Sequence, residues 1–333
     1  MYEENEKKLI REQVEELKQR LTASFVFKRF EKDILIKLES KQIEPVYEIP
    51  FTTFKRNIQS LVSVVRLPIE MSFERAIKLL YDNIKRRHTI LAIKDKINEE
   101  DLDPYAENDK DSRQERIVSI ASAEFNAFLK TEEGRDKFWL HSLAFVNNCA
   151  HESHTTEDFL NASKELVNQA TLLTWSALEI FMRDFFIIYL NKNPDKIESL
   201  SKVSILKQKF DLKSISTDQL MKYNFDLSAN MGDILIENFD FSNIELIKTI
   251  YNSLFDHADL SKTLKHTNIW NLYQNRNLIV HKGGIVDKKF VSNTDTKLQI
   301  GEKLFIQPIH FQEYFASIIN VVIAVADAIH HDA

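Results

Sequence analysis

The residues best suited to chemistry lie within one short stretch that contains Arg276, Asn277 and His281. A histidine can accept or donate a proton near neutral pH, and an arginine can neutralise charge that develops on an anionic group. Asn277 and His281 are four residues apart, so they share one face of a helix. Gly283 and Gly284 follow, as is typical of a left-handed helix C-cap. The pattern indicates acid–base chemistry on an anionic substrate at a helix end.

A helix over 269–281 must position these side chains, and its spacing predicts an unusual place for Arg276. At 100° per residue, Arg276 falls near the middle of an arc of about 120° that also holds Ile269, Leu272, Tyr273, Ile279 and Val280. An unpaired guanidinium on a buried stripe costs several kcal/mol, so Arg276 must meet a carboxylate, a phosphate or a water-filled cleft. The structural alternative is an ion pair with Glu179 or another acid, with His281 capping the helix end as a cation.

Arg276, Asn277 and His281, with the two glycines that follow, form an arrangement that resembles the Arg-x4-6-His motif of the HEPN (higher eukaryotes and prokaryotes nucleotide-binding) family. Many members are RNA-cleaving toxins or defence proteins. The order of elements is also similar, with a long apolar helix around 175–184, a later helix that carries the motif, a hairpin and a terminal helix. The resemblance covers about 155–330, roughly half of the chain, and leaves the first 150 residues unexplained.

The residues and the resemblance together predict a metal-independent endoribonuclease without a cofactor. His281 is expected to move a proton at the ribose 2′-OH or the leaving 5′-oxygen, Arg276 to neutralise the scissile phosphate, and Asn277 to bind phosphate or hold the imidazole. The products end in a 2′,3′-cyclic phosphate. Because two acid–base groups are wanted, we expect a homodimer that shares the cleft, as the family is understood to form. A toxin or antiphage role, with a regulatory or antitoxin partner, is implied by the resemblance alone.

Three further residues are expected to support the site. Glu179 lies on an apolar helix face, where either a salt bridge to Arg183 at i+4 or a role in orienting Arg276 or His281 explains its carboxylate. Tyr273 either stacks on a base or packs in the core.

A second arginine–histidine pair, Arg135 and His141, also satisfies the looser motif spacing, with Asp136 beside the arginine. Arg276 is preferred because it adds the adjacent Asn277 and the helix-ending glycines. The other function that remains open is a non-catalytic helical module that binds a protein partner or a nucleotide.

The composition predicts an all-α fold. Only 5 glycines and 6 prolines occur in 333 residues, which disfavours turn-rich sheet folds. We expect a helical bundle of HEPN type with an extra N-terminal helical region, and a small β-hairpin formed by 285–291 and 303–307 near the C-terminus. Charge and composition divide the chain into an N-terminal helical region (1–97), an acidic linker (98–115) and a HEPN-like domain (116–333, core 155–333). Expected helices include 116–130, 136–149, 155–190, 243–255, 260–281 and 311–330.

The net charge, 44 minus 50 or −6, excludes a broadly basic surface but leaves room for a local one. Residues 41–96 are the most basic region, with Lys85, Arg86 and Arg87 at its centre. This run is either the solvated face of a helix or a contact to the RNA backbone.

One cysteine, Cys149, and an acidic N-terminus without a signal-peptide pattern predict a cytoplasmic protein. The apolar runs 180–190 and 315–329 are too short or too charged to span a membrane, so no membrane association is expected. Cys149, His151 and His154 lack a clear fourth zinc ligand, and no metal is expected.

Overall fold

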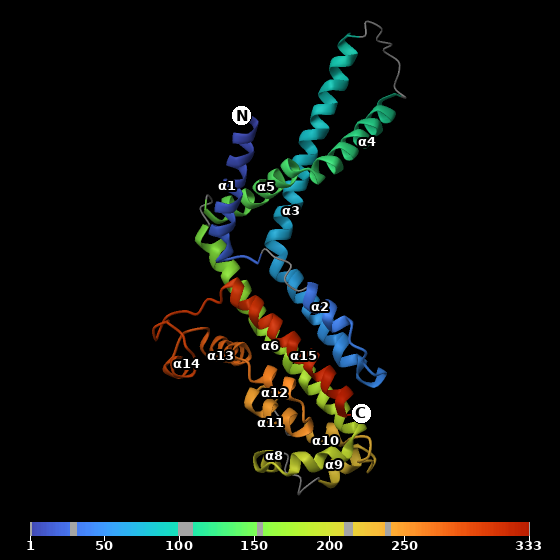
Figure 1. Ribbon diagram of the computed structural model, residues 1–333, viewed down its shortest axis with the longest axis vertical. Helices are drawn as coiled ribbons and strands as arrows, with labels where there is room; N and C mark the ends of the chain where they lie inside the picture. The colour runs from blue at the N-terminus through green and yellow to red at the C-terminus, as the bar shows by residue number, and fades with distance from the viewer. Residues whose placement is uncertain are drawn as a thin grey trace. The chain divides into compact units, whose positions relative to one another are not determined.

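The computed structural model describes residues 2–26, 32–98, 109–151, 156–209, 216–236 and 241–332. Every regular element within these ranges is a helix, so the predicted all-α class is confirmed (Figure 1). The few glycines and prolines leave long stretches of chain free to form uninterrupted helices.

The chain divides into two compact units. One is made of 1–27 and 66–163, and the other of 28–65 and 164–333. The predicted ranges 1–97, 98–115 and 116–333 were drawn from charge and composition and stay a prediction. Of the predicted acidic linker, residues 99–108 lie outside the described residues, and residues from 109 onward begin a helix.

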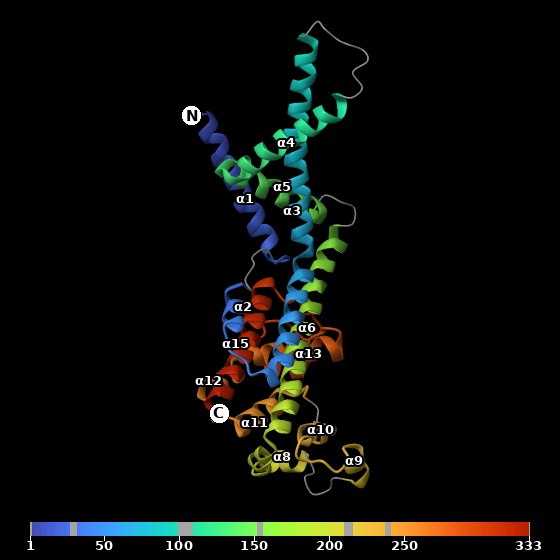
Figure 2. The same ribbon diagram turned by 90° about the vertical axis from the view of Figure 1, so that its right-hand side faces the viewer.

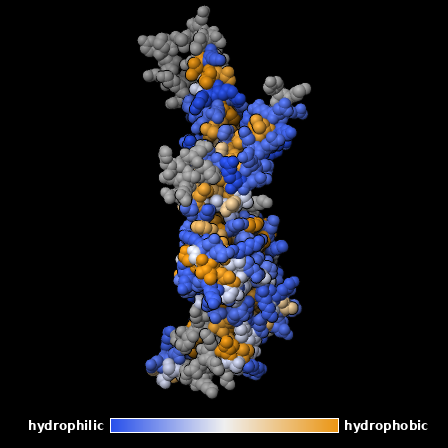
Figure 3. All heavy atoms as spheres, turned by 90° about the vertical axis from the view of Figure 1, so that its left-hand side faces the viewer, coloured by the Kyte–Doolittle hydropathy of each residue, from blue (hydrophilic) through white to orange (hydrophobic). Residues whose placement is uncertain are grey.

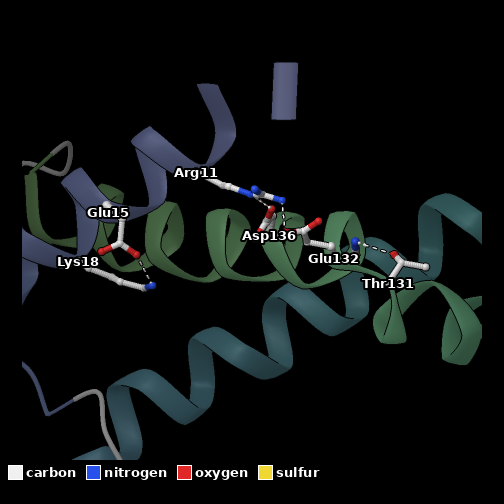
Figure 4. A network of polar contacts seen from close by, with 7 residues as sticks. Arg11, Glu15, Lys18, Thr131, Glu132 and Asp136 are labelled. Carbon is white, nitrogen blue, oxygen red and sulfur yellow. Dashed lines mark hydrogen bonds and ion pairs between the residues drawn. The ribbon is translucent and has the colours of Figure 1, made fainter. Parts of the chain in front are cut away.

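The first unit is built around α5 (Glu132–His151), which packs against α1 (Tyr2–Thr22) and α4 (Asp109–Lys130). Arg11 of α1 reaches two acids at the start of α5, and its Nε donates to Asp136 Oδ2 at 2.9 Å while the guanidinium also pairs with Glu132 (Figure 4). Apolar side chains of α1, of the segment directly after it, of α3 (Glu48–Asn98) and of α5 form the core, which includes Val14, Leu21, Phe25, Ile69, Leu143 and Val146.

Gly134 lies in the first turn of α5, where the chain turns back from α4. A Cβ atom built on it would lie 1.9 Å from the carbonyl oxygen of Phe128, so only glycine fits there without a shift of the backbone. The break between the two helices, predicted at Gly134, lies slightly earlier, at Thr131. The Thr131 hydroxyl accepts the N–H of Gly134 at 3.0 Å.

The second unit holds the remaining helices, together with the start of α3 (Glu48–Asn98) and most of α6 (Thr156–Lys192). Its shorter elements are α2 (Lys32–Glu39), η1 (Pro45–Tyr47), η2 (Pro194–Lys196), α7 (Ile197–Ser201), α8 (Ser204–Lys209), α9 (Thr217–Lys222), α10 (Met231–Ile236), α11 (Ile244–Leu254), α12 (Ala258–Leu264), α13 (Thr267–Lys282), α14 (Lys288–Asn293) and the long α15 (Pro308–Asp332).

Aromatic rings of α6 form the core of this unit. Phe185 contacts the ring of Tyr251 on α11 with centroids 6.2 Å apart, and Phe181 meets Phe51 of α3 edge-on at 4.9 Å. Tyr251 is fully buried and donates its hydroxyl to the carbonyl oxygen of Met182 at 2.6 Å. Burial raises the pKa of Tyr251 well above its ordinary value.

α15 packs against α2, α12 and α13, and it lies beside α12 and α13 in both ribbon views (Figures 1 and 2). By length and composition alone, 308–331 could cross a membrane, although 61% of its most apolar stretch is buried inside the described structure. The expected lack of membrane association stays a prediction. On the face shown in Figure 3, hydrophobic side chains form separate patches among hydrophilic ones.

The predicted β-hairpin is wrong. Within the described ranges there are no strands, and Ile285 and Lys303 form a single isolated antiparallel bridge. Residues 288–291, the second part of the expected first strand, begin α14 instead, because the Asp287 side chain accepts the N–H of Phe290 at 2.8 Å and starts a helix. The single helix predicted over 260–281 is two, α12 and α13, and His266 Nδ1 caps the second by accepting the N–H of Asn268.

Candidate active site

The C-terminal end of α13 carries the predicted site, and its cap is as the sequence predicts. Gly283 has a φ of 60°, in the left-handed region, and its N–H donates to the carbonyl oxygen of Leu278. Gly284 also has a positive φ, of 80°, and its N–H reaches the same oxygen at 3.2 Å. This left-handed C-cap ends the helix directly after His281 and Lys282.

The buried face of α13 matches the predicted one only in part: Ile269, Leu272 and Ile279 of the predicted arc are buried. Val280, also expected within that arc, is 51% exposed, and Tyr273 is half-buried. The buried side also includes two amides, Gln274 and Asn275, which are 7% and 6% exposed. At 100° per residue Arg276 falls between the buried Ile269 and Leu272, and 21% of its side chain is exposed, so it is partly buried.

Hydrogen bonds to neighbouring helices explain the buried amides. Asn275 Nδ2 donates to the Tyr314 hydroxyl of α15 at 3.0 Å, and Gln274 Oε1 accepts from Asn293 Nδ2 of α14 at 3.4 Å. Burial raises the pKa of Tyr314, although the hydrogen bond from Asn275 acts in the opposite direction. A pattern of apolar spacing could not reveal this face, because these partners come from distant segments.

Arg276 connects two of the predicted site residues. Its Nη1 donates to Asn277 Oδ1 at 2.9 Å, and its Nη2 lies 3.9 Å from Glu179 Oε2 on α6. The same Glu179 oxygen accepts the indole N–H of Trp175 at 2.9 Å. Since the side chains of Arg276 and Glu179 are 21% and 27% exposed, solvent screens this pair and it is not a sealed ionic contact.

Arg183 does not pair with Glu179. Its guanidinium binds the adjacent Asp184, with Nε donating to Oδ1 at 2.9 Å, so the alternative of an intrahelical Glu179–Arg183 salt bridge is wrong. Glu179 contacts Arg276 instead. Arg183 therefore lies outside the group of side chains that surround Arg276.

A pocket of about 250 Å³ opens beside this helix end. Six residues of α13 and three from the start of α14 line it: Tyr273, Gln274, Asn277, Leu278, His281, Lys282, Asp287, Lys289 and Phe290. The structure thus brings the predicted residues His281, Asn277 and Tyr273 to one cavity. Arg276 is not part of the wall and reaches it only through Asn277.

Four polar residues of the pocket were missed by the sequence analysis. Lys282 could have been found from the sequence, because it directly follows His281. Asp287 and Lys289 were assigned to a strand, which hid their place at the start of α14. Gln274 carries no signal of its own in the sequence, because its contact with Asn293 of α14 comes from a later segment of the chain.

Tyr273 both packs and lines the pocket. Its ring centroid lies 5.3 Å from that of Trp175 and 5.8 Å from that of Trp270. The Trp270 indole N–H donates to the carbonyl oxygen of Asn293 at 2.8 Å, which ties α13 to the end of α14. Trp175 and Trp270 therefore hold the ring of Tyr273 in place.

The basic run of α3 lies in the first unit, and the predicted RNA-binding residues differ in their surroundings. Arg87 pairs with Glu124 of α4, and His88 Nε2 lies 2.6 Å from the other oxygen of that carboxylate. Hydrogen bonds from Arg87 and His88 lower the pKa of Glu124. Arg86 is exposed and Lys85 half-buried, so part of the basic charge stays on the surface.

The second arginine–histidine pair is engaged elsewhere. Arg135 donates to the carbonyl oxygen of Lys130, and Asp136 binds Arg11. Burial, and then the nearby Lys137 charge, lower the pKa of His141.

No group of three or more histidine, cysteine or acidic side chains within the described part of the chain is arranged to hold a metal ion. His154, one member of the weak zinc-like run, lies outside the described residues. Comparisons with protein-family models, curated proteins and solved structures find no match.

Proposed function

We propose that the chain is a metal-independent endoribonuclease with a HEPN-type site at the C-terminal end of α13. The observation that carries the proposal is the pocket in which His281, Asn277 and two lysines, Lys282 and Lys289, line one cavity. An imidazole next to ammonium groups is suited to proton transfer on a phosphodiester, because the cations attract the phosphate that the imidazole must reach.

Each group has a chemical task in cleavage by the ribose 2′-OH. His281 removes the 2′-OH proton or protonates the leaving 5′-oxygen, and Lys282 and Lys289 hold the phosphate. Arg276 binds Asn277 Oδ1, so it fixes the amide and adds positive charge behind the pocket wall. The new 2′-oxygen–phosphorus bond forms as the 5′-oxygen–phosphorus bond breaks, which leaves a 2′,3′-cyclic phosphate and a 5′-hydroxyl.

A homodimer is part of the proposal. The reaction uses one base and one acid, and the pocket contains one histidine, His281. A two-fold axis near this exposed helix end would supply the second imidazole from an identical chain. The toxin or antiphage role and a regulatory or antitoxin partner rest on the resemblance alone. We place the protein in the cytoplasm, a proposal that the single cysteine supports because it allows no disulfide within the chain.

A second candidate is a non-catalytic module that binds a protein partner or a nucleotide. The contact between Arg276 and Glu179 favours it, since a guanidinium with its own carboxylate needs no phosphate. In that case the pocket binds without cleaving.

RNA cleavage in EDTA distinguishes the two candidates. Mixed RNA is incubated with the wild-type chain and with the His281→Ala and Arg276→Ala variants. We expect wild-type cleavage, with a loss of about 10²–10⁴-fold in His281→Ala, the range of general acid–base catalysis. Arg276→Ala is expected to lose about tenfold or more.

The matched controls are His310→Ala and Arg56→Ala, which remove an exposed histidine and an exposed arginine of the same unit outside the pocket. Both should cleave like the wild type. Cleavage that survives both site substitutions, or that needs magnesium, would remove the assignment.

A further inference from the structure

Gln274 is a buried amide with an unused donor on the pocket wall. Its side chain is 7% exposed, and Oε1 accepts from Asn293 Nδ2 at 3.4 Å, which fixes the amide. Among the hydrogen bonds of the described residues, Nε2 of Gln274 donates none. Glu165 Oε2 is the one fully enclosed side-chain atom without a hydrogen-bond partner among the described residues, so Gln274 Nε2 keeps access to the pocket that Gln274 lines. A ligand in the pocket that brings an acceptor can therefore bind this donor.

We propose that Gln274 selects the base of a bound nucleotide, with preference for uracil or guanine over adenine or cytosine. The proposal rests on the proposed function for RNA as the natural ligand, while nucleotide binding itself can be measured without cleavage.

A second donor lies on the same side of α13. Asn277 is three residues after Gln274, so the two side chains are neighbours on the helix surface. Asn277 Oδ1 is already occupied by Arg276 Nη1, which leaves its Nδ2 as the group available to a ligand in the pocket. Two N–H donors therefore border one cavity, and both amides are fixed through their oxygens.

The remaining wall matches a nucleotide. Leu278 and Phe290, 4% and 5% exposed, give the cavity an apolar surface for a flat ring, and Lys282 and Lys289 supply positive charge for a phosphate. Asp287 adds one acceptor, because its Oδ1 is used by the N–H of Phe290 and its second oxygen remains for a ligand.

Base chemistry then sets the preference. Uracil and guanine carry carbonyl oxygens for the amide donors and an imino N–H for the Asp287 carboxylate. Adenine and cytosine carry an exocyclic amino group where uracil and guanine have a carbonyl, and neither has an imino N–H. A donor placed against another donor loses the hydrogen bond and leaves both groups unpaired, which disfavours these two bases.

Calorimetric titration of the full chain in EDTA with UMP, GMP, AMP, CMP and inorganic phosphate tests the proposal. We expect UMP or GMP to bind at least about tenfold more tightly than AMP and CMP, the scale of one hydrogen bond left unmade. Inorganic phosphate should bind more weakly than any nucleotide that the pocket selects.

Gln274→Glu keeps the size of the side chain and replaces the donor with acceptors, so the preference should disappear or reverse towards AMP and CMP. Gln274→Met is a second variant that lacks both donor and charge, and its thermal midpoint reports any loss of folding. Gln169→Glu, at an exposed glutamine of α6, is the matched control and should keep the wild-type preference.

Equal affinity for all four nucleotides, no nucleotide binding, or an unchanged preference in both folded Gln274 variants would overturn the proposal. The outcome for cleavage is separate. If the chain prefers certain bases but does not cleave RNA, the base-selection proposal stands and the nuclease proposal fails. If it cleaves RNA without a base preference, the nuclease proposal stands and the base-selection proposal fails.

Discussion

At the scale of single residues, Arg276 shows what apolar spacing can and cannot reveal. The spacing found a residue that contacts Glu179 and Asn277 beside a pocket, but 21% of the Arg276 side chain is exposed, so it is only partly buried. The arginine that does lie on a buried helix face is Arg66, 4% exposed, whose Nη2 lies 2.8 Å from Glu70 Oε1 one turn on. A buried arginine is therefore not a marker of function, and the pocket supports the site better than burial does.

The contact between Glu179 and Arg276 is expected to be weak. A double-mutant cycle that replaces each residue with alanine should give a coupling below about 1 kcal/mol in the free energy of unfolding, because both side chains are partly exposed and 3.9 Å separates their charged atoms. Urea denaturation of the four proteins measures it. A cycle between Glu179 and Arg183 serves as the reference and should show no coupling.

A coupling of about 3 kcal/mol or more would identify a structural ion pair, and would favour the non-catalytic module over the nuclease.

At the scale of elements, the sequence predicted the helices that carry their own signals. α6 and α15 follow from long apolar stretches, and the end of α13 follows from Gly283 and Gly284. α14 was missed because Ile285, Val286, Phe290 and Val291 are typical of a strand, whereas a single cap decides the helix. The break between α12 and α13 depends on His266 acting as an N-cap, which is an uncommon role for histidine.

Asn168 of α6 holds the segment that leads from α14 into α15. Its Nδ2 donates to the carbonyl oxygen of Leu304 at 3.2 Å, and its Oδ1 accepts the N–H of Ile306 at 3.1 Å. The side chain is 1% exposed, so Asn168→Ala leaves two buried backbone groups unpaired. We expect a loss of about 2–4 kcal/mol in the free energy of unfolding, measured in urea.

Gln169→Ala, at the exposed neighbouring position, is the control and should cost less than about 0.5 kcal/mol. A similar small effect for Asn168→Ala would show that α6 does not hold this segment.

At the scale of the whole molecule, the two units were beyond prediction from charge and composition. Two of the three boundaries, 65/66 and 163/164, fall inside α3 and α6, so they do not coincide with a linker. The third, 27/28, lies outside the described residues. Side chains that are remote in sequence decide the division, such as Phe185 and Tyr251 in one unit and Arg11 and Asp136 in the other. Local composition does not predict such contacts.

The first unit should lose stability in mild acid. Burial, followed by the Lys137 charge, lowers the pKa of His141 below its ordinary value of 6.5. The unfolded chain therefore binds more protons than the folded one between the lowered pKa and 6.5, and stability falls as the pH decreases through that window. Thermal unfolding from pH 7.5 to pH 5 should show a smaller decrease in His141→Gln than in the wild type.

Glu124 affects stability in a different pH window. Hydrogen bonds from Arg87 and then His88 lower the pKa of Glu124, so its contribution is lost only below the ordinary value of 4.5. Identical pH profiles for the wild type and His141→Gln above pH 5 would contradict the assignment to His141.

The central claim is that the end of α13 cleaves RNA through the ribose 2′-OH, and the chemical ends of the products test it most directly. An RNA of defined sequence is incubated with the full chain in EDTA, beside the same RNA with one 2′-deoxyribose at the cut position. We predict 2′,3′-cyclic phosphate and 5′-hydroxyl ends, dependence on His281, and no cut at the deoxyribose. Products with 3′-hydroxyl and 5′-phosphate ends, or cleavage at the deoxyribose, would contradict the account.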